Sequence, residues 1–284
     1  SVSRGLGDVY KSQVWNLGQN AAGIAVRFRS DSPVIAVKWE NTFNNSMKHM
    51  APVGIKGLDL YCFIDGKWRF VNSAQPSGKT NQWQIISGMN AAEREYMLYL
   101  PLYDGIHSLQ IGVAAPSHIG QPSLPYPDTR KPIIFYGSSI TQGACASRPG
   151  MAATNLIGRK LNVETINLGF SGNAFIDYEV AEMMAHVDAS AYVLDYVPNA
   201  SPEQILEKTE KFVRILREKH PDVPLIFVED PIFPHSKFDL RMAKEIKDKN
   251  DAMNQAFSSL KKQGLKKIYL VKGRSLISAN GEST

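Results

Sequence analysis

The sequence predicts an α/β protein, in which a flavodoxin-like α/β/α domain follows an antiparallel β-sandwich or jelly-roll domain. In the first part of the chain, apolar and polar residues alternate with a period of two, which is typical of half-buried antiparallel strands. In the second part, short apolar runs alternate with longer segments of helical periodicity, which is typical of βαβ units. We therefore expect a sandwich domain at residues 1–127 and an α/β domain at residues 128–284.

The first domain is expected to contain short strands joined by tight turns. Asp65-Gly66 predicts a hairpin, because this dipeptide adopts the backbone conformation that two-residue turns require. Tyr103-Asp104-Gly105 predicts a second hairpin. A proline-rich segment, 115–131, reads as an extended linker, and we place the domain boundary near Pro127. The expected strands are 25–29, 34–40, 58–64, 68–71, 95–102 and 107–114.

The second domain is expected to be a parallel sheet of about five strands with helices between them. Ser201 and Pro202 indicate a helix start, since serine caps helix N-termini and proline suits the first turn. Connections of this kind are right-handed. The expected strands are 133–136, 164–168, 191–196, 224–228 and 267–271, and the expected helices are 151–161, 177–187, 202–219 and 239–262.

Composition excludes several classes of function. Hydrophobic residues make up 43% of the chain, which is ordinary for a globular protein. The formal charge is +5 and no run of five like charges occurs, so we expect no nucleic-acid partner. The two cysteines lie far apart and the six histidines form no HExxH motif, so neither a disulfide framework nor a metal site is expected. No apolar run is long enough to span a membrane. Neither GxGxxG nor GxxxxGK[ST] occurs, and no cofactor is expected.

Small or polar residues follow three consecutive strands of the second domain. Ser139 follows the first strand, Gly172 the second and Asn199 the third. Ligands of open α/β sheets bind at the carboxyl ends of the strands, so these loops are expected to meet at one edge. Ser139 is then a candidate nucleophile, and its own N–H, the N–H of Gly172 and the Asn199 amide could bind an oxyanion. Taken singly, each could be an ordinary turn, helix entry or cap.

Together these residues resemble the SGNH (GDSL-type) hydrolase superfamily. Gly137-Ser138-Ser139-Ile140 matches its first block, with Ser138 where many members have Asp, while Gly172 and Asn199 match the second and third blocks. The segment 141–150 and the motif Gly57-Leu-Asp-Leu-Tyr61 resemble a bacterial subfamily with an N-terminal GxDLY β-sandwich. The resemblance implies ester hydrolysis, often deacetylation of carbohydrates, without a metal or organic cofactor.

The fourth block of the family departs from this pattern. It is an Asp-x-x-His sequence after the fifth strand, and its histidine is the base, but no histidine follows His235 here. Members usually continue with a closing helix that covers the sheet, so we expect Thr284 to be a truncation or cleavage point. His235 and His118 could substitute as the base. The favoured interpretation of His235 is an exposed loop residue or substrate contact, and a non-catalytic role is likewise favoured for His118 in the proline-rich segment.

Three further residues are candidate substrate contacts: Ser138, Arg148 and His235. Arg148 could grip a substrate oxygen or form a buried salt bridge, and the sequence leaves both open. Glu229 and Asp230 could pair with it. Asp59 and Tyr61 share one strand face, so they could contact the neighbouring domain together.

The favoured hypothesis is a serine esterase that acts on small acyl groups, acetyl first among them, carried by a carbohydrate. The alternatives are a non-catalytic glycan-binding protein with a degenerate hydrolase domain, and an acyltransferase that uses the same site. The chain begins at Ser1 without a signal-peptide core, so a mature secreted or periplasmic protein and a trimmed chain are both open; we expect the former. The oligomeric state is not predicted.

Overall fold

A computed structural model describes residues 9–125 and 131–277. The chain forms two compact units, and their limits differ from a simple division of the sequence. The first unit comprises residues 1–130 and 142–167, and the second comprises 131–141 and 168–284. The segment 142–167 therefore packs with the sandwich that precedes it. The predicted boundary at Pro127 lies outside the described residues.

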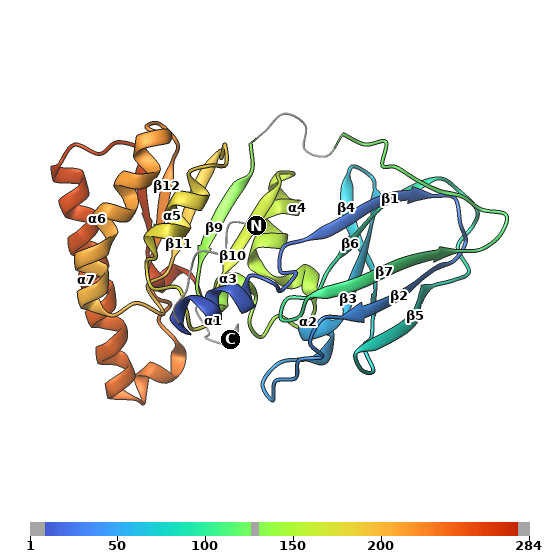
Figure 1. Ribbon diagram of the computed structural model, residues 1–284, viewed down its shortest axis with the longest axis horizontal. Helices are drawn as coiled ribbons and strands as arrows, with labels where there is room; N and C mark the ends of the chain where they lie inside the picture. The colour runs from blue at the N-terminus through green and yellow to red at the C-terminus, as the bar shows by residue number, and fades with distance from the viewer. Residues whose placement is uncertain (1–8, 126–130, 278–284) are drawn as a thin grey trace. The chain divides into compact units, whose positions relative to one another are not determined.

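The first unit is built around two antiparallel sheets (Figure 1). One sheet has the strand order β4-β3-β6-β1-β8 and the other has the order β5-β2-β7. Phe28 and Leu60 of the larger sheet and Val37 and Trp39 of the smaller one belong to a single buried core. The strands are β1 (Ala25–Ser30), β2 (Ile35–Asn41), β3 (Leu58–Ile64), β4 (Lys67–Ala74), β5 (Thr80–Ile86), β6 (Arg94–Tyr99), β7 (Ile106–Val113) and β8 (Ile119–Gly120).

The hairpin at Asp65-Gly66 is confirmed, because β3 and β4 pair across it. The hairpin expected at 103–105 is wrong, since β6 belongs to the larger sheet and β7 to the smaller one. Asp104 explains the difference. Its buried carboxylate accepts hydrogen bonds from the backbone N–H groups of Phe43, Asn44, Asn45 and Gly105, which turns the chain from one sheet to the other.

Helices α1 (Val9–Leu17), α2 (Pro52–Lys56) and α4 (Ala153–Leu161) complete the described part of the first unit, with a short 3-10 turn, η1 (Pro149–Met151). Sequence periodicity predicted α4 but neither α1 nor α2, and it also missed β5. Helix α2 has only five residues, which is too short for a helical period to be recognised.

The second unit carries the parallel sheet, with the order β10-β9-β11-β12-β13 expected of a flavodoxin-like fold. The strands of the sheet are β9 (Ile133–Gly137), β10 (Thr165–Gly169), β11 (Ala191–Asp195), β12 (Leu225–Val228) and β13 (Ile268–Val271). The first residues of β10, up to Asn167, are counted with the first unit. The helices are α3 (Ser139–Gln142), α5 (Tyr178–Met184), α6 (Pro202–Lys219) and α7 (Leu240–Lys262), with 3-10 turns η2 (Pro234–Lys237) and η3 (Gly273–Ser275). All five predicted strands are confirmed, as are the four predicted helices, which are α4, α5, α6 and α7.

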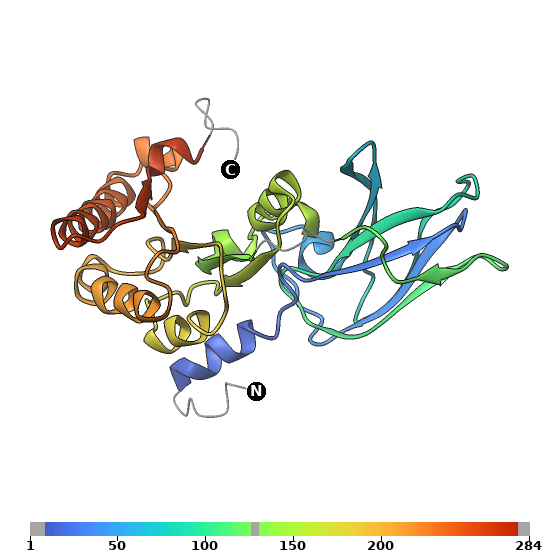
Figure 2. The same ribbon diagram turned by 90° about the horizontal axis from the view of Figure 1, so that it is seen from above.

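Helices α5, α6 and α7 lie side by side, with α6 between the other two (Figures 1 and 2). Tyr136 of β9 stacks on Phe212 of α6 at 5.3 Å between ring centroids, and Phe227 of β12 meets Phe257 of α7 at 5.9 Å. Ser201 caps α6 as predicted, in a capping box with Gln204. These contacts bury one face of the sheet and hold the strand ends in place.

The other face of the sheet is less completely covered within the described residues. Phe135, Val193, Ile226 and Tyr269 lie in register across β9, β11, β12 and β13. Val193 and Ile226 are half-buried and Tyr269 is 54% exposed. Within the described residues, apolar sheet surface is thus exposed on this face.

Candidate active site

Backbone hydrogen bonds join the three predicted loops at the carboxyl edge of the sheet. The N–H of Phe170, which follows β10, donates to the carbonyl of Gly137 at 2.8 Å. The N–H of Ser138 donates to the carbonyl of Asp195, the last residue of β11, at 3.2 Å. Because β10, β9 and β11 are neighbours, Ser139, Gly172 and Asn199 follow three adjacent strands.

Ser139 opens α3 directly after β9 and is half-buried. Gly137 makes this tight turn possible. A Cβ atom at Gly137 would lie 2.2 Å from Thr141 Oγ1 and 2.6 Å from the carbonyl oxygen of Asp195, so only glycine fits. Ser138 points inward: it is completely buried, and its Oγ accepts a hydrogen bond from the N–H of Ile140 at 3.3 Å.

Gly172 and Asn199 have the properties that an oxyanion hole needs. Gly172 is exposed, has a positive φ of 69°, and leaves open space where a side chain would stand. Asn199 is half-buried, and its Oδ1 accepts a hydrogen bond from the N–H of Ala174 at 3.2 Å. With the oxygen of the amide engaged, the Asn199 Nδ2 group is the end that can donate to a ligand.

Two buried carboxyl groups lie behind this edge. Burial raises the pKa of Asp195 to about 7, with the Asp230 charge adding to the rise and a hydrogen bond from Thr141 opposing it. That bond, from Thr141 Oγ1 to Asp195 Oδ2, is 2.7 Å long and ties α3 to the end of β11. Burial also raises the pKa of Asp230 to about 6. The positive charge of Lys249 opposes this rise, and the negative charge of Glu245 adds to it.

The titration of Asp195 leads to a prediction on stability. The folded protein keeps a proton on Asp195 up to about pH 7, whereas the unfolded chain releases it near the ordinary value of 3.8. This carboxyl therefore contributes stability below that ordinary pKa, and the contribution is lost as the pH rises through 7. In Asp195→Asn the side chain no longer titrates. Between pH 5 and pH 8 the melting temperature of this variant is therefore expected to fall by a few degrees less than that of the wild type.

Thermal unfolding of both proteins across this pH range measures the difference. Asp222→Asn is the matched control, because the Asp222 side chain is 83% exposed and its partner Lys267 stays charged across this range, so the pH dependence should be unchanged. If the melting temperatures of the wild type and Asp195→Asn depend on pH in the same way, the raised pKa of Asp195 is contradicted.

Arg148 lies in the first unit and binds the GxDLY motif. Its Nη1 is 2.8 Å from the Asp59 carboxylate and 2.6 Å from the Tyr61 hydroxyl, and its guanidinium lies 3.7 Å from the centre of the Phe70 ring. Asp59 also accepts hydrogen bonds from Gly150 N–H at 2.8 Å and Ser73 Oγ at 2.6 Å. Of the two interpretations left open by the sequence, the structure shows the salt bridge.

Glu229 binds residues other than Arg148, the partner that the sequence suggested. Its carboxylate accepts hydrogen bonds from Lys272 Nζ at 3.0 Å, Asn254 Nδ2 at 2.7 Å and Gly273 N–H at 2.9 Å. The N–H and C=O of Asp230 both bind the side chain of Asn250, at 2.7 and 3.0 Å. Sequence reasoning missed these α7 residues, because nothing in their spacing distinguishes them from ordinary polar positions of a helix.

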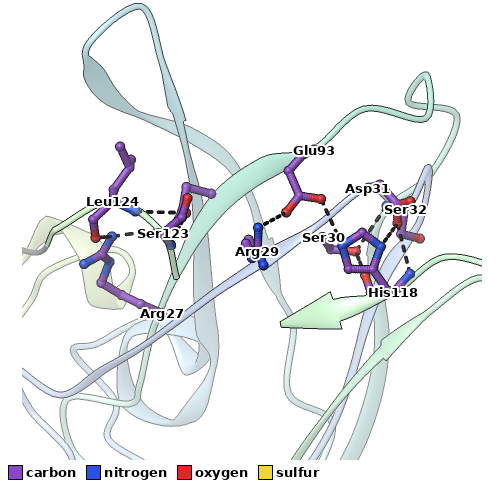
Figure 3. Close-up of polar contacts among 10 residues, drawn as sticks. Arg27, Arg29, Ser30, Asp31, Ser32, Glu93, His118, Ser123 and Leu124 are labelled. Atoms are coloured by element: carbon purple, nitrogen blue, oxygen red, sulfur yellow. Dashed lines mark hydrogen bonds and ion pairs between the residues drawn. The ribbon is translucent and has the colours of Figure 1, made fainter. Parts of the chain in front are cut away.

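The two histidines considered as substitute bases lie in different surroundings. His235 is exposed in η2, after β12, with its ring 5.7 Å from that of Phe233. His118 is in the first unit, where its ring lies between Asp31, 3.3 Å from Nδ1, and Glu93, 3.1 Å from Nε2 (Figure 3). Figure 3 also shows Arg29 on the other oxygen of Glu93. These contacts attach the proline-rich segment to the sandwich and account for His118 as a structural residue.

A cavity of about 610 Å³ lies in the first unit, between β1, β6 and the end of the segment 142–167. Arg27, Tyr99 and Asn167 are among its lining residues, but none of the candidate site residues is. The candidate site residues Ser139, Gly172 and Asn199 lie instead at the strand edge of the second unit.

Comparisons with known proteins found matching family models and similar solved structures. A family model described as the GDSL-like lipase/acylhydrolase family matches residues 130–284, and one described as the N-terminus of Esterase_SGNH_hydro-type, GxDLY, matches residues 5–119. No curated protein matches the chain. A crystal structure described as a GDSL-like lipase from Bacteroides ovatus is 40% identical, with a TM-score of 0.92, over 97% of this chain and 82% of that one.

More distant structures share the fold. The salicylyl-acyltransferase SsfX3 from a tetracycline biosynthetic pathway is 18% identical, with a TM-score of 0.73, over 92% of this chain and 73% of that one. A family two carbohydrate esterase from Clostridium thermocellum, in complex with cellohexaose, is 13% identical, with a TM-score of 0.60, over 89% and 82% of the two chains. Within the described residues, no helix of this chain has the length and apolar character to cross a membrane.

Proposed function

Because the chain belongs to the GDSL-like lipase/acylhydrolase family, we propose that it is a serine esterase that removes small acyl groups, acetyl first among them, from carbohydrates. The observation that carries the proposal is the arrangement of three adjacent strand ends, where a half-buried serine follows one strand and two suitable hydrogen-bond donors follow its neighbours.

The first half of the reaction forms an acyl-enzyme. Ser139 Oγ attacks the ester carbonyl carbon as its proton passes to a base, and the carbonyl oxygen becomes an oxyanion. The backbone N–H groups of Ser139 and Gly172 and the Nδ2 of Asn199 donate hydrogen bonds to that oxygen. Collapse of the tetrahedral intermediate breaks the ester bond, and the sugar hydroxyl leaves with the proton from the base.

The second half regenerates the enzyme. Water gives a proton to the base and attacks the acyl carbon, the oxyanion forms again in the same place, and the acid leaves as Ser139 recovers its proton. We assign the base to the histidine of the Asp-x-x-His block implied by the family. His235 is the last histidine of the sequence.

The proposal that the substrate is a carbohydrate ester is supported by the family two carbohydrate esterase, which shares this fold. A secreted or periplasmic location is part of the same proposal. Acyl transfer is the second candidate, since an acyltransferase also shares the fold and the chemistry differs only in the acceptor that attacks the acyl-enzyme.

The test is detection of the acyl-enzyme in the full-length protein as its gene encodes it. During turnover of an aryl acetate, rapid acid quenching and peptide mass spectrometry are expected to find an acetyl group on Ser139. Product analysis with acetylated oligosaccharides, with and without an added sugar alcohol as acceptor, then separates release of acetate from transfer. Turnover with the label on another residue, or no turnover at all, would overturn the proposal.

A further inference from the structure

Lys249 is a buried cation that the proposed mechanism does not use. It lies on α7 with only 9% of its surface exposed. Its Nζ is 3.0 Å from the carbonyl oxygen of Pro198 and 2.7 Å from the carboxylate of Glu245, one helical turn earlier. Burial of an ammonium group is unfavourable unless strong partners compensate it, and a methionine could fill similar space without that cost. The negative charges of Glu245 and Asp230 offset this cost, and the bond to Pro198 connects Lys249 to the loop that carries Asn199.

The Pro198 carbonyl and the Asn199 N–H belong to one planar peptide unit. Lys249 holds the carbonyl end of this unit, and the carbonyl of Tyr196 accepts a hydrogen bond from the Asn199 N–H at 3.0 Å. The plane is thus fixed at both ends, directly before the Cα atom that carries the Asn199 side chain. Since hydrogen bonds from a charged donor are about twice as strong as neutral ones, Lys249 is the stronger of the two anchors.

The Asn199 side chain is held separately through its Oδ1, which accepts the Ala174 N–H. The two restraints act on different atoms: Ala174 fixes the rotation of the amide, and Lys249 fixes the peptide from which the side chain projects. An oxyanion donor has to lie within a few tenths of an ångström of its place, because its benefit depends on being ready before the charge develops.

We propose that Lys249 is a positioning residue, which orients the Pro198–Asn199 peptide so that the Asn199 amide is held at the oxyanion. This inference rests on the proposed function, since it concerns the same site. It predicts that Lys249 matters for the chemical step and acts through Asn199.

A double-mutant cycle tests this in the full-length protein, with an aryl acetate as the substrate. Asn199→Ala is expected to lower kcat about 10²-fold. Lys249→Met is expected to lower kcat about tenfold, with KM within about twofold of the wild type, since misplacement of a catalytic group can cost up to about 10²-fold. In the Asn199→Ala background, Lys249→Met should cause no further loss, because the amide that it positions is already absent.

Lys244→Met is the matched control. Lys244 is on the same helix and also pairs with an acidic residue four positions away, Asp248, but its side chain is 77% exposed. It should leave kcat unchanged. If Lys249→Met does not remain folded at the assay temperature, as judged by its melting curve, Lys249→Gln replaces it in the same cycle with the same criteria.

The possible results separate the two proposals. Loss of kcat that disappears in the Asn199→Ala background supports the positioning role. Wild-type kcat in the Lys249 variant, or a loss that persists in full in that background, overturns this inference while the esterase stands. A wild-type protein without Ser139-dependent activity overturns the proposed function and this inference with it.

Discussion

Replacing Ser139 by alanine is expected to lower kcat for an acetyl ester by at least about 10³-fold, because the covalent route through the acyl-enzyme is lost. KM should change little, since the Ser139 hydroxyl contributes little to binding of the unreacted ester. The residual rate would come from the proposed oxyanion donors at Gly172 and Asn199, which this substitution does not change. Steady-state hydrolysis of an aryl acetate by the full-length protein measures the loss.

Ser258→Ala is the control for this experiment, since Ser258 is exposed on α7 and lies outside the candidate site. Its kcat should equal that of the wild type. The melting temperature of Ser139→Ala is measured beside that of the wild type, so that a loss of rate is read only at a temperature where both proteins are folded. Retention of the wild-type rate by Ser139→Ala would remove Ser139 from the mechanism.

The second large effect concerns Asp59 of the GxDLY motif. Asp59→Ala is expected to lower the free energy of unfolding by about 3–5 kcal/mol, because it leaves the Arg148 guanidinium without its carboxylate. The Asp59 side chain is completely buried, and three groups donate to it: Arg148 Nη1, Gly150 N–H and Ser73 Oγ. Gly150 N–H and Ser73 Oγ would then lose this acceptor, and Arg148 Nη1 would keep only the Tyr61 hydroxyl.

Urea unfolding followed by tryptophan fluorescence and by circular dichroism measures this change. Glu40→Ala is the control in the same unit, because the Glu40–Lys79 pair is 3.8 Å long and exposed, and such pairs contribute at most about 1 kcal/mol. A double variant, Asp59→Ala with Arg148→Ala, should be destabilised by less than the sum of the single changes, since the unpaired cation is also removed. Additive losses would show that the two residues do not act as a pair.

These two predictions differ in how far the sequence alone could support them. Ser139 was predicted as a candidate from its place after a buried apolar strand, and the family resemblance added Gly172 and Asn199. The parallel sheet was equally predictable, because the period of the apolar residues changes from two to that of a helix after the linker. Local patterns of this kind depend only on residues close together in the chain.

The tertiary structure decided the rest. No local pattern shows that 142–167 packs with the sandwich, that Asp104 sends β6 and β7 into different sheets, or that Asp59 binds Arg148. The same holds for Lys249, whose partner Pro198 is 51 positions away in the chain. The sequence by itself determined which residues could do chemistry and which elements would carry them, because side-chain type and periodicity are local. Which polar groups pair, and so which of them are free to act on a substrate, follows from long-range contacts that only the folded chain brings together.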